Sequence, residues 1–317
     1  MFLFRISFFL PLALLAETTL ATIGYPTALS LQNGPQTFIQ PTIAGTVESG
    51  MWGNVREYGR RFHKGIDIRS AQKDRRGEPT DPVLSILDGT VMYVNKVSGR
   101  SSYGCYVVVQ HDLDMPLFTT YAHMSHIDVV EGQKVVKGQS LGIMGRNSLG
   151  RLFPKDRAHV HFETGLQLSN SNFQAWYNKT YKRTNPNFHG LWNGLNFIAW
   201  NPLAFYAALN QGVSLSDFIK NLPTDLVVRI RTQTVPAFVT RYPKLLKAPL
   251  PAKVEGWEIE FTWFGLPKAW TPMTIAPAQR RSFVPSPSLR ATHQDLLYLS
   301  NNNPKLFLEK VLYLCGL

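Results

Sequence analysis

Two histidines separated by one residue are the first side chains in this sequence whose types and spacing could do chemistry. They lie in the strand-like segment Ala158-His159-Val160-His161-Phe162-Glu163. Because strand side chains alternate between two faces, both histidines are expected on one face. Neutral imidazole is the commonest protein metal ligand and suits zinc. In isolation the pattern also fits two unrelated polar residues on a solvated face, so other parts of the chain must supply further ligands.

A second pair of candidate ligands lies about a hundred residues upstream. His63 and Asp67 are four residues apart, which places them on one face of either a helix or a strand. Gly65 and the alternating Ile66 and Ile68 favour an extended strand. A hydrolytic zinc site needs three protein ligands and an open position for water. His63, Asp67 and one histidine of the downstream pair would meet that need, although strand geometry does not choose between His159 and His161.

The elements that must position these residues are short strands separated by glycine turns. Between Pro82 and Gly145, apolar runs such as 90–94, 104–111 and 118–124 alternate with turn sequences such as Asp88-Gly89. Such spacing is typical of an antiparallel all-β unit, either a sandwich or a partly open barrel. No G-x-G-x-x-G opening a helix and no Walker sequence occurs, so nucleotide binding has no support.

Six short sequence motifs in this region together resemble those of one protein family. They are His63-Lys64-Gly65-Ile66-Asp67-Ile68, Asp88-Gly89-Thr90-Val91, Tyr103-Gly104-Cys105-Tyr106-Val107, Thr120-Tyr121-Ala122-His123-Met124-Ser125, Glu131-Gly132-Gln133-Lys134-Val135 and His159-Val160-His161-Phe162-Glu163. In kind and in order, the stretch from about Gly50 to Thr164 resembles the catalytic domain of lysostaphin-type (LytM-like) zinc endopeptidases, which are peptidoglycan hydrolases.

This resemblance implies roles for five residues. His63, Asp67 and His161 would be the Zn²⁺ ligands, and His123 and His159 would stand beside the metal as general base and transition-state stabiliser. No HExxH sequence is present to supply the usual glutamate.

Three further residues receive weaker roles. Tyr58, upstream of His63, is a candidate to stabilise the oxyanion, with a packing or surface role as its alternative, and Asn54 is a similarly weak candidate. Glu163 is expected to accept a hydrogen bond instead of binding metal.

The sequence departs from the family pattern in two places that border the expected cleft. The usual Asn-Pro-Leu closing turn recurs only at Asn201-Pro202-Leu203, which implies an insertion over about 167–199. The segment Arg146 to Arg157 is longer and more basic than the short turn that generally precedes the histidine pair. Both differences concern substrate details and leave the expected metal site intact.

Residues 211–317 are expected to form a smaller α+β appendage to a domain at 49–210. Alternation predicts strands over 227–233 and 257–263, and helices are expected at 214–221 and 304–314. Ser216 and Asp217 are the capping candidates of the first helix, and Pro304 suits the first turn of the second. Trp257 and Trp263 favour core packing over glycan stacking.

The N-terminus predicts export. Residues 1–21 contain Arg5, a short apolar run and small residues before Ala21, which together are typical of a cleaved signal peptide, and 22–48 form a low-charge, extended lead. The alternative is a retained membrane anchor. Only Cys105 and Cys315 are present, so one disulfide at most could form, and Cys105 is expected to be a buried free thiol.

Charge and export together narrow the class of partner. The chain has 33 Lys and Arg against 21 Asp and Glu, a net charge of +12, which favours acidic partners unless the charge is simply dispersed for solubility. Export disfavours nucleic acid. The expected function is a secreted, periplasmic or cell-envelope zinc endopeptidase that hydrolyses stem peptides or cross-links of peptidoglycan. The alternative is a non-catalytic LytM-like domain that binds the wall and activates or recruits another hydrolase.

Overall fold

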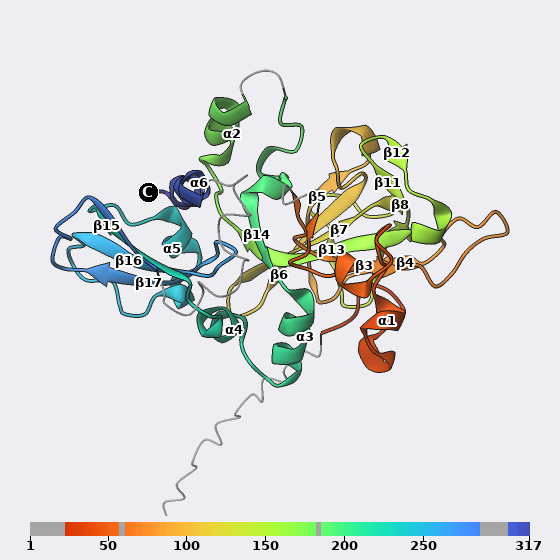
Figure 1. Ribbon diagram of the computed structural model, residues 1–317, viewed down its shortest axis with the longest axis horizontal. Helices are drawn as coiled ribbons and strands as arrows, with labels where there is room; N and C mark the ends of the chain where they lie inside the picture. Colours follow the sequence, from red (N-terminus) through yellow and green to blue (C-terminus); the bar gives the residue numbers. More distant parts are fainter. Residues whose placement is uncertain (1–22, 57–60, 182–184, 286–303) are drawn as a thin grey trace, which may run out of the picture.

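The fold is built around one large antiparallel sheet (Figure 1). The computed structural model describes residues 23–56, 61–181, 185–285 and 304–317. The sheet order is β14-β13-β7-β6-β5-β9, with β3 also paired to β13. The strands are β3 (Ile66–Arg69), β5 (Gly89–Asn95), β6 (Tyr106–Asp112), β7 (Pro116–Ala122), β9 (Lys134–Val135), β13 (His159–Gln167) and β14 (Phe197–Trp200). The expected mainly β, antiparallel fold is confirmed.

The two faces of the large sheet have different neighbours. Val107, Val109, Val160 and Phe162 belong to the main core, which also contains residues of a smaller sheet. That sheet has the order β4-β10-β8, formed by β4 (Pro82–Leu84), β10 (Ser140–Met144) and β8 (Met124–Ile127). Because strand side chains alternate, the histidines of β13 point to the opposite face. This second face is the one that carries the candidate site.

Short elements surround the second face of the large sheet. They are two hairpins, β1 (Val55–Arg56) with β2 (Arg61–Phe62) and β11 (Asn147–Ser148) with β12 (Arg151–Leu152), and the 3-10 turns η3 (Ser98–Arg100) and η4 (Lys155–Arg157). The β11–β12 hairpin and η4 account for the basic segment 146–157. Arg146 is held there by a two-nitrogen ion pair with Glu78, at 2.7 Å for each contact.

The expectation that the lead is extended is wrong over much of its length. The structure has η1 (Leu31–Asn33), α1 (Pro35–Phe38) and η2 (Val47–Gly50), and its one isolated bridge in the described lead joins Ile39 to Ile68. Phe38 and Ile39 are fully buried in the main core. Pro35 follows Gly34 at the first helical position, where its fixed φ and missing N–H are tolerated. The lead thereby packs against the strand that carries Asp67.

The insertion forms a helix and two short turns before the chain returns to the sheet. These are α2 (Phe173–Tyr181), η5 (Gly190–Trp192) and η6 (Gly194–Asn196), and β14 then pairs with β13. The Asn201-Pro202-Leu203 sequence begins α3 (Pro202–Asn210), where the Asn201 side chain accepts a hydrogen bond from the Leu203 N–H. Trp192 and Phe197 pack on Phe118 and Tyr106. The insertion therefore covers part of the face that carries the histidines.

The C-terminal region forms a second, four-stranded antiparallel sheet with the order β17-β16-β15-β18. Its elements are α4 (Leu215–Asn221), β15 (Leu226–Arg231), α5 (Ala237–Arg241), η7 (Pro243–Leu245), β16 (Gly256–Phe261), β17 (Pro267–Met273), β18 (Arg281–Pro285) and α6 (Pro304–Cys315). The strands and helices predicted there are confirmed within two residues at most boundaries. Trp257 is fully buried, as expected of a core residue, whereas Trp263 is half-buried.

The predicted cap of α4 is wrong. The Ser214 hydroxyl accepts from the Asp217 N–H at 3.1 Å, so Ser214 is the N-cap. Asp217 instead accepts the Ser214 O–H at 2.8 Å, and the Ser216 N–H points to Asp114. The N-cap, Ser214, lies one position before the first residue of the helix, and the carboxylate of Asp217 follows three residues later, as in a capping box.

The two sheets share one continuous apolar core. Phe218 of α4 packs on Trp200 and Phe205, with ring centroids 5.9 and 5.3 Å apart. The Gln167 N–H donates to the Tyr242 hydroxyl at 3.1 Å. The division into a domain at 49–210 and an appendage at 211–317 stays a prediction.

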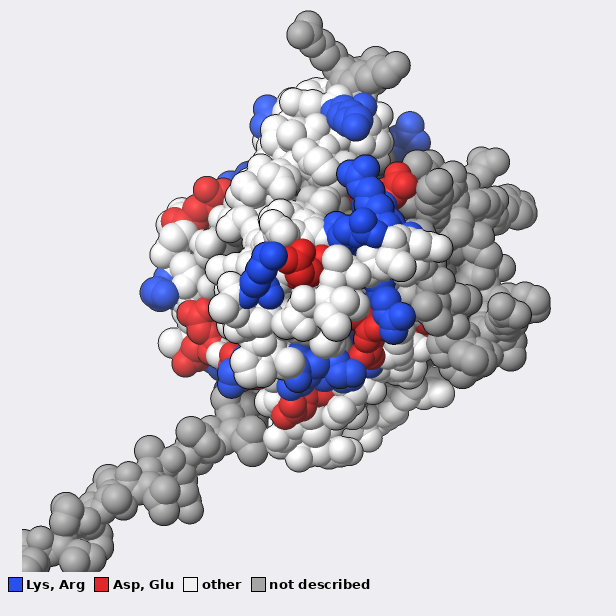
Figure 2. Space-filling view, turned by 90° about the vertical axis from the view of Figure 1, so that its left-hand side faces the viewer, with Lys and Arg blue, Asp and Glu red and all other residues white. Residues whose placement is uncertain are grey.

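The charge on the face formed by the C-terminal sheet is dispersed. Figure 2 shows Lys and Arg there beside Asp and Glu, with neutral surface between them. Cross-strand pairs include Arg229–Glu258 at 2.7 Å and Lys247–Glu260 at 2.6 Å. On this face the surplus of cations forms no single patch, which agrees with the dispersed-charge alternative.

Three expectations concern the termini and the cysteines. Cys105 is a free thiol but only half-buried, and Cys315 is a fully buried free thiol. Burial raises the pKa of both thiols.

Across 23–56, 61–181, 185–285 and 304–317 no helix has the length and apolarity needed to cross a bilayer. The signal peptide expected at 1–21 lies outside the described residues.

The shared core makes a prediction about cooperativity. Truncating Phe218 to Ala removes a buried ring that joins the two sheets, and we expect it to lower the free energy of unfolding by about 3 kcal/mol in one transition. Denaturant unfolding followed by tryptophan fluorescence measures this. The control is Ile275→Ala, because Ile275 is 80% exposed and should change little. Two separate transitions, with only one shifted by the Phe218 variant, would show that the sheets unfold independently.

Candidate metal centre

Three of the predicted site residues meet at one point between β2, β3 and β13. His63 Nε2, Asp67 Oδ1 and His161 Nδ1 form a triangle with edges of 3.0, 3.0 and 2.9 Å. Asp67 and His161 are directly opposite each other in the antiparallel pairing of β3 with β13, and His63 follows β2. Tetrahedral zinc with bonds of 2.0–2.1 Å has ligand atoms roughly 3.3 Å apart, so the triangle is close to one face of that polyhedron. The donor set therefore fits zinc.

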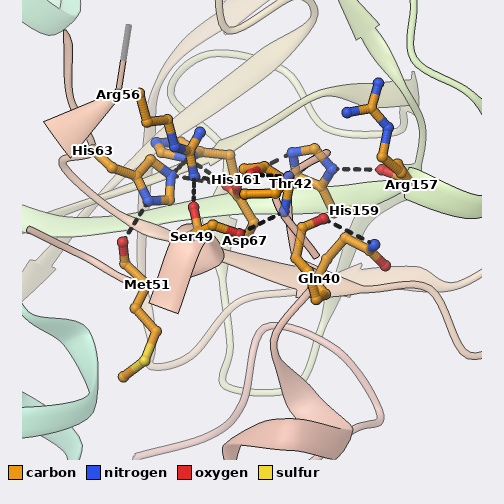
Figure 3. A network of polar contacts seen from close by, with 12 residues as sticks. Gln40, Thr42, Ser49, Met51, Arg56, His63, Asp67, Arg157, His159 and His161 are labelled. Carbon is orange, nitrogen blue, oxygen red and sulfur yellow. Dashed lines mark hydrogen bonds and ion pairs between the residues drawn. The ribbon is translucent and has the colours of Figure 1, made fainter. Parts of the chain in front are cut away.

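The outer nitrogens of both imidazoles are occupied by acceptors. His63 Nδ1 lies 2.7 Å from the Met51 carbonyl oxygen (Figure 3), and His161 Nε2 lies 2.9 Å from Glu163 Oε1. A carbonyl or a carboxylate can only accept, so each outer nitrogen has an acceptor that would hold its proton when a metal occupies the inner nitrogen. The inner nitrogens both face Asp67 Oδ1, and this outer-shell arrangement is the one that metal-binding histidines require.

Asp67 is held in place by an arginine that the sequence analysis did not single out. Arg56 Nη2 donates to Asp67 Oδ2 at 2.9 Å, which leaves Oδ1 to face the imidazoles. Burial alone would raise the pKa of Asp67, but His63, His159 and His161 hold it well below its usual range. Asp67 is therefore an anion at neutral pH, with one oxygen on Arg56 and the other at the centre of the triangle.

His161 lies between two carboxylates and under an aromatic ring. Burial alone would lower the pKa of its imidazole, but the hydrogen bonds with Asp67 and Glu163 raise it. Glu163 also accepts the Tyr103 O–H at 2.7 Å. Burial alone would raise the pKa of Glu163, but the neighbouring Lys64 and His161 lower it to about 2. The expected role of Glu163 as a hydrogen-bond acceptor is confirmed. Tyr103 stacks on His161 with ring centroids 5.6 Å apart.

The other two histidines, His123 and His159, lie beside the triangle and face each other. Their ring centroids are 4.9 Å apart, and His159 Nε2 is 3.6 Å from Asp67 Oδ1. His159 Nδ1–H donates to the Arg157 carbonyl at 2.7 Å, and His123 Nδ1–H donates to the Asn147 carbonyl at 2.8 Å. Burial lowers both imidazole pKa values, that of His123 strongly. Each ring is thus neutral, with an unprotonated Nε2.

His123 is fixed in an unusual backbone conformation. Its φ of 63° lies in the left-handed region, which costs a non-glycine residue roughly 1–2 kcal/mol. The His123 N–H donates to the Tyr103 carbonyl at 2.8 Å. The Asn147 side chain in turn accepts the Cys105 N–H at 2.8 Å, and a Cβ on Gly104 would lie only 1.9 Å from its Oδ1. Asn147 thereby ties the turn before β6 to the strained residue that follows β7.

A cavity of about 160 Å³ opens over these groups. It is lined by the four histidines and Asp67, together with Pro41 and Thr42 from the lead and Phe153 and Arg157 from the basic segment. Phe153 packs on both His123 and His159, with ring centroids 5.0 and 5.1 Å away. The lead and the basic segment thus form two walls of the cavity.

The remaining candidate residues lie away from the triangle or outside the described residues. His126 is exposed and pairs with Asp128 at 3.0 Å. His111 is fully buried and bonds to Asp88 and Thr119, while His189 bonds to Tyr93 and Arg100. Asn54 contributes its carbonyl, which accepts the His63 N–H at 2.9 Å. Tyr58 and His293 lie outside the described residues.

Comparisons with known proteins identify the region that carries this centre. Residues 61–173 match the model of peptidase family M23. A lipoprotein NlpD/LppB homolog of Pseudomonas aeruginosa is 35% identical over 106 residues, which are 33% of this chain and 30% of the relative. An uncharacterized metalloprotease of Haemophilus influenzae is 31% identical over 103 residues, 32% of this chain and 18% of the relative. The chain thus spans less than a third of the length of these curated relatives.

Solved structures of small catalytic domains are also similar. The catalytic domain of lysostaphin from Staphylococcus simulans is 18% identical with a TM-score of 0.32, and 50% of this chain and 89% of that chain are covered. The catalytic domain of the prophage-encoded M23 protein EnpA from Enterococcus faecalis is 26% identical with a TM-score of 0.29, covering 40% and 79%. The matched residues contain all five of the histidine and aspartate positions described above. Residues 61–173 thus match peptidase family M23, in agreement with the LytM-like resemblance of the sequence.

Proposed function

We propose that this protein is a zinc-dependent endopeptidase of the bacterial cell envelope that hydrolyses peptide bonds in the stem peptides or cross-links of peptidoglycan. The triangle of His63 Nε2, Asp67 Oδ1 and His161 Nδ1 carries the proposal. The M23 match and the sequence resemblance to peptidoglycan hydrolases give the substrate class by analogy.

The metal assignment favours His161 over His159. His161 Nδ1 is 2.9 Å from Asp67 Oδ1, whereas His159 Nε2 is 3.6 Å away and has no contact with His63 among the described polar contacts. The geometry thus supports the assignment that the family resemblance implies, with His63, Asp67 and His161 as the ligands. When bound, Zn²⁺ would lower the pKa of water and polarise the scissile carbonyl.

His159 and His123 would handle the proton. Each presents an unprotonated Nε2 to the cavity and keeps its Nδ1–H on a backbone carbonyl. One imidazole can therefore accept a proton from the attacking water, steady the oxyanion through the N–H so formed, and deliver that proton to the leaving nitrogen. The other imidazole can accept a hydrogen bond from the water at its Nε2 and so orient it for attack. Low pKa values keep both rings neutral, and thus able to accept, at neutral pH.

A non-catalytic wall-binding domain is the second candidate function. It is favoured by the relative that is described as a lipoprotein instead of a peptidase. Loss of a ligand or of a proton-handling histidine would be expected in such a domain, yet all five positions are present here. The endopeptidase is accordingly the better-supported function. The same proposal includes export, cleavage of the 1–21 segment and a location in the cell envelope.

Removing a ligand tests the metal centre. His161→Ala should lower zinc affinity by more than about 100-fold and abolish hydrolysis of purified peptidoglycan, because two ligands remain where three are needed. Zinc content is measured by mass spectrometry on protein purified without added metal. His126→Ala is the control, since His126 is exposed and remote from the triangle. Full zinc content together with full cleavage in the His161 variant would refute the assignment.

Removing a proton-handling residue should separate catalysis from metal binding. His123→Ala is expected to retain zinc at the wild-type level while its kcat falls by about 100-fold or more, since no described ligand atom is lost. Zinc content and the rate of cleavage of a purified cross-linked muropeptide are measured on the same preparation. If zinc is lost in parallel with activity, His123 belongs to the ligand set and not beside it.

Absence of zinc and of any cleavage in the wild-type protein, with binding to the wall preserved, would favour the non-catalytic candidate.

A further inference from the structure

A second, larger cavity adjoins the metal centre on the side covered by the insertion. It encloses about 420 Å³ and shares His63, Tyr103 and His161 with the first cavity. Its outer wall comes from the insertion, through residues such as Tyr177, His189 and Asn193. The two cavities therefore adjoin at Tyr103 and at two residues of the triangle.

The insertion is fastened to the site by specific contacts. The Gly194 carbonyl accepts from Lys64 Nζ at 2.7 Å, and the Trp192 carbonyl accepts from the Tyr106 hydroxyl at 3.2 Å. A Cβ on Gly194 would lie 2.5 Å from the Tyr103 hydroxyl oxygen, so the backbone itself packs on that ring. His189 Nε2–H donates to the Arg100 carbonyl at 2.9 Å. The insertion, which forms the outer wall of the cavity, is therefore in direct contact with Lys64, Tyr103 and Arg100, which line the same cavity.

The charge of this cavity is positive. Lys64, Arg100 and Arg61 line it, and Glu163 is the one carboxylate among its lining residues. Glu163 is already engaged by His161, by Tyr103 and by Lys64 at 3.7 Å. The Arg100 guanidinium lies 5.0 Å over the exposed ring of Phe188 and has no carboxylate partner among the described residues. Lys64 bonds to one carbonyl and keeps donor capacity, because an ammonium group has three N–H bonds.

We propose that this insertion-walled cavity binds a free carboxylate of the peptide substrate, close to the scissile bond, with Arg100 as its main counter-charge and Lys64 beneath it. The inference rests on the proposed peptidase function. A guanidinium with no carboxylate partner among the described residues can form an ion pair with two parallel hydrogen bonds to a carboxylate, whereas a neutral amide in its place offers one acceptor oxygen and no charge. A cavity lined by cations also concentrates anions near its mouth. The substrate is thereby an acidic peptide whose carboxylate is not amidated.

The test compares two forms of one substrate. A cross-linked muropeptide with free carboxylates and the same muropeptide with its carboxylates amidated are cleaved by the wild type and by Arg100→Gln, and KM and kcat are measured separately. We expect the wild type to have a several-fold lower KM for the acidic form. Arg100→Gln should raise KM for the acidic form about threefold to tenfold with little effect on the amidated form, because a partly exposed charge pair is lost.

Two control variants complete the design. Arg100→Lys should restore part of the preference, since it keeps the charge. Arg151→Gln removes the same net charge from an exposed position that lines neither cavity, and should leave both KM values unchanged. Equal KM values for the two substrates in the wild type, or an equal change for both in Arg100→Gln, would overturn the proposal.

Direct binding keeps this inference separate from the proposed function. Affinity for the two muropeptides is measured by calorimetry on the same proteins. If the wild type cleaves neither muropeptide but binds the acidic one more tightly, and Arg100→Gln removes that difference, the peptidase function fails while the carboxylate site stands. If it cleaves both with no difference in affinity or KM, the function stands and the carboxylate site fails.

Discussion

The antiparallel pairing of β3 with β13 is the interaction on which the rest of the site depends. In this register Asp67 is directly opposite His161, and Ile66 and Ile68 are opposite Phe162 and Val160. The apolar members of both strands are buried in the main core, which fixes the register. A shift of one residue would send the ligands to the core and the apolar side chains to the cavity. The core thus specifies the metal centre indirectly, by permitting only one pairing.

Backbone carbonyls orient the imidazole rings of His63, His159 and His123 by accepting their outer N–H groups. Met51, Arg157 and Asn147 each accept the outer N–H of one histidine. These acceptors come from loops that are anchored elsewhere, and Met51 is followed by Trp52, whose ring packs on Trp263 and Phe264 of the C-terminal region at 5.4 and 5.0 Å. A chain of contacts therefore leads from the second sheet to the carbonyl that holds His63. This gives a physical reason for the two sheets to share one core.

Much of the site could be predicted from sequence because its residues carry their chemistry in their types and local spacing. Asp67 and His161 lie on strands whose period is two, and His63 comes directly after β2, so short patterns indicate which of their side chains share a face. Arg56 and Asn147 could not be found in this way, since their partners are remote in sequence and Asn147 acts through a carbonyl that any residue has. The lead was mispredicted because Pro35 and Gly34 indicate a break in an extended segment but not the helical turn that follows.

The position of the insertion also could not be predicted from the sequence. Its existence could be predicted from the delayed Asn201-Pro202-Leu203 turn, but its position over the histidine-bearing face depends on packing of Trp192 and Phe197 against Phe118. Composition alone did not connect Arg100 with Phe188 either, because eight strands, β6 to β13, lie between the two residues in the sequence. Long-range packing of aromatic side chains therefore decides which loops border the cleft, and hence what the cleft can recognise.

The most direct test of the account is a crystal structure of the protein purified with zinc, with anomalous scattering recorded at the zinc edge. The account predicts one strong anomalous peak within about 2.0–2.2 Å of His63 Nε2, Asp67 Oδ1 and His161 Nδ1, with Glu163 still bonded to His161 Nε2. A peak bonded to His159 or His123 in place of His161, or no peak at these residues in protein that contains zinc, would contradict it.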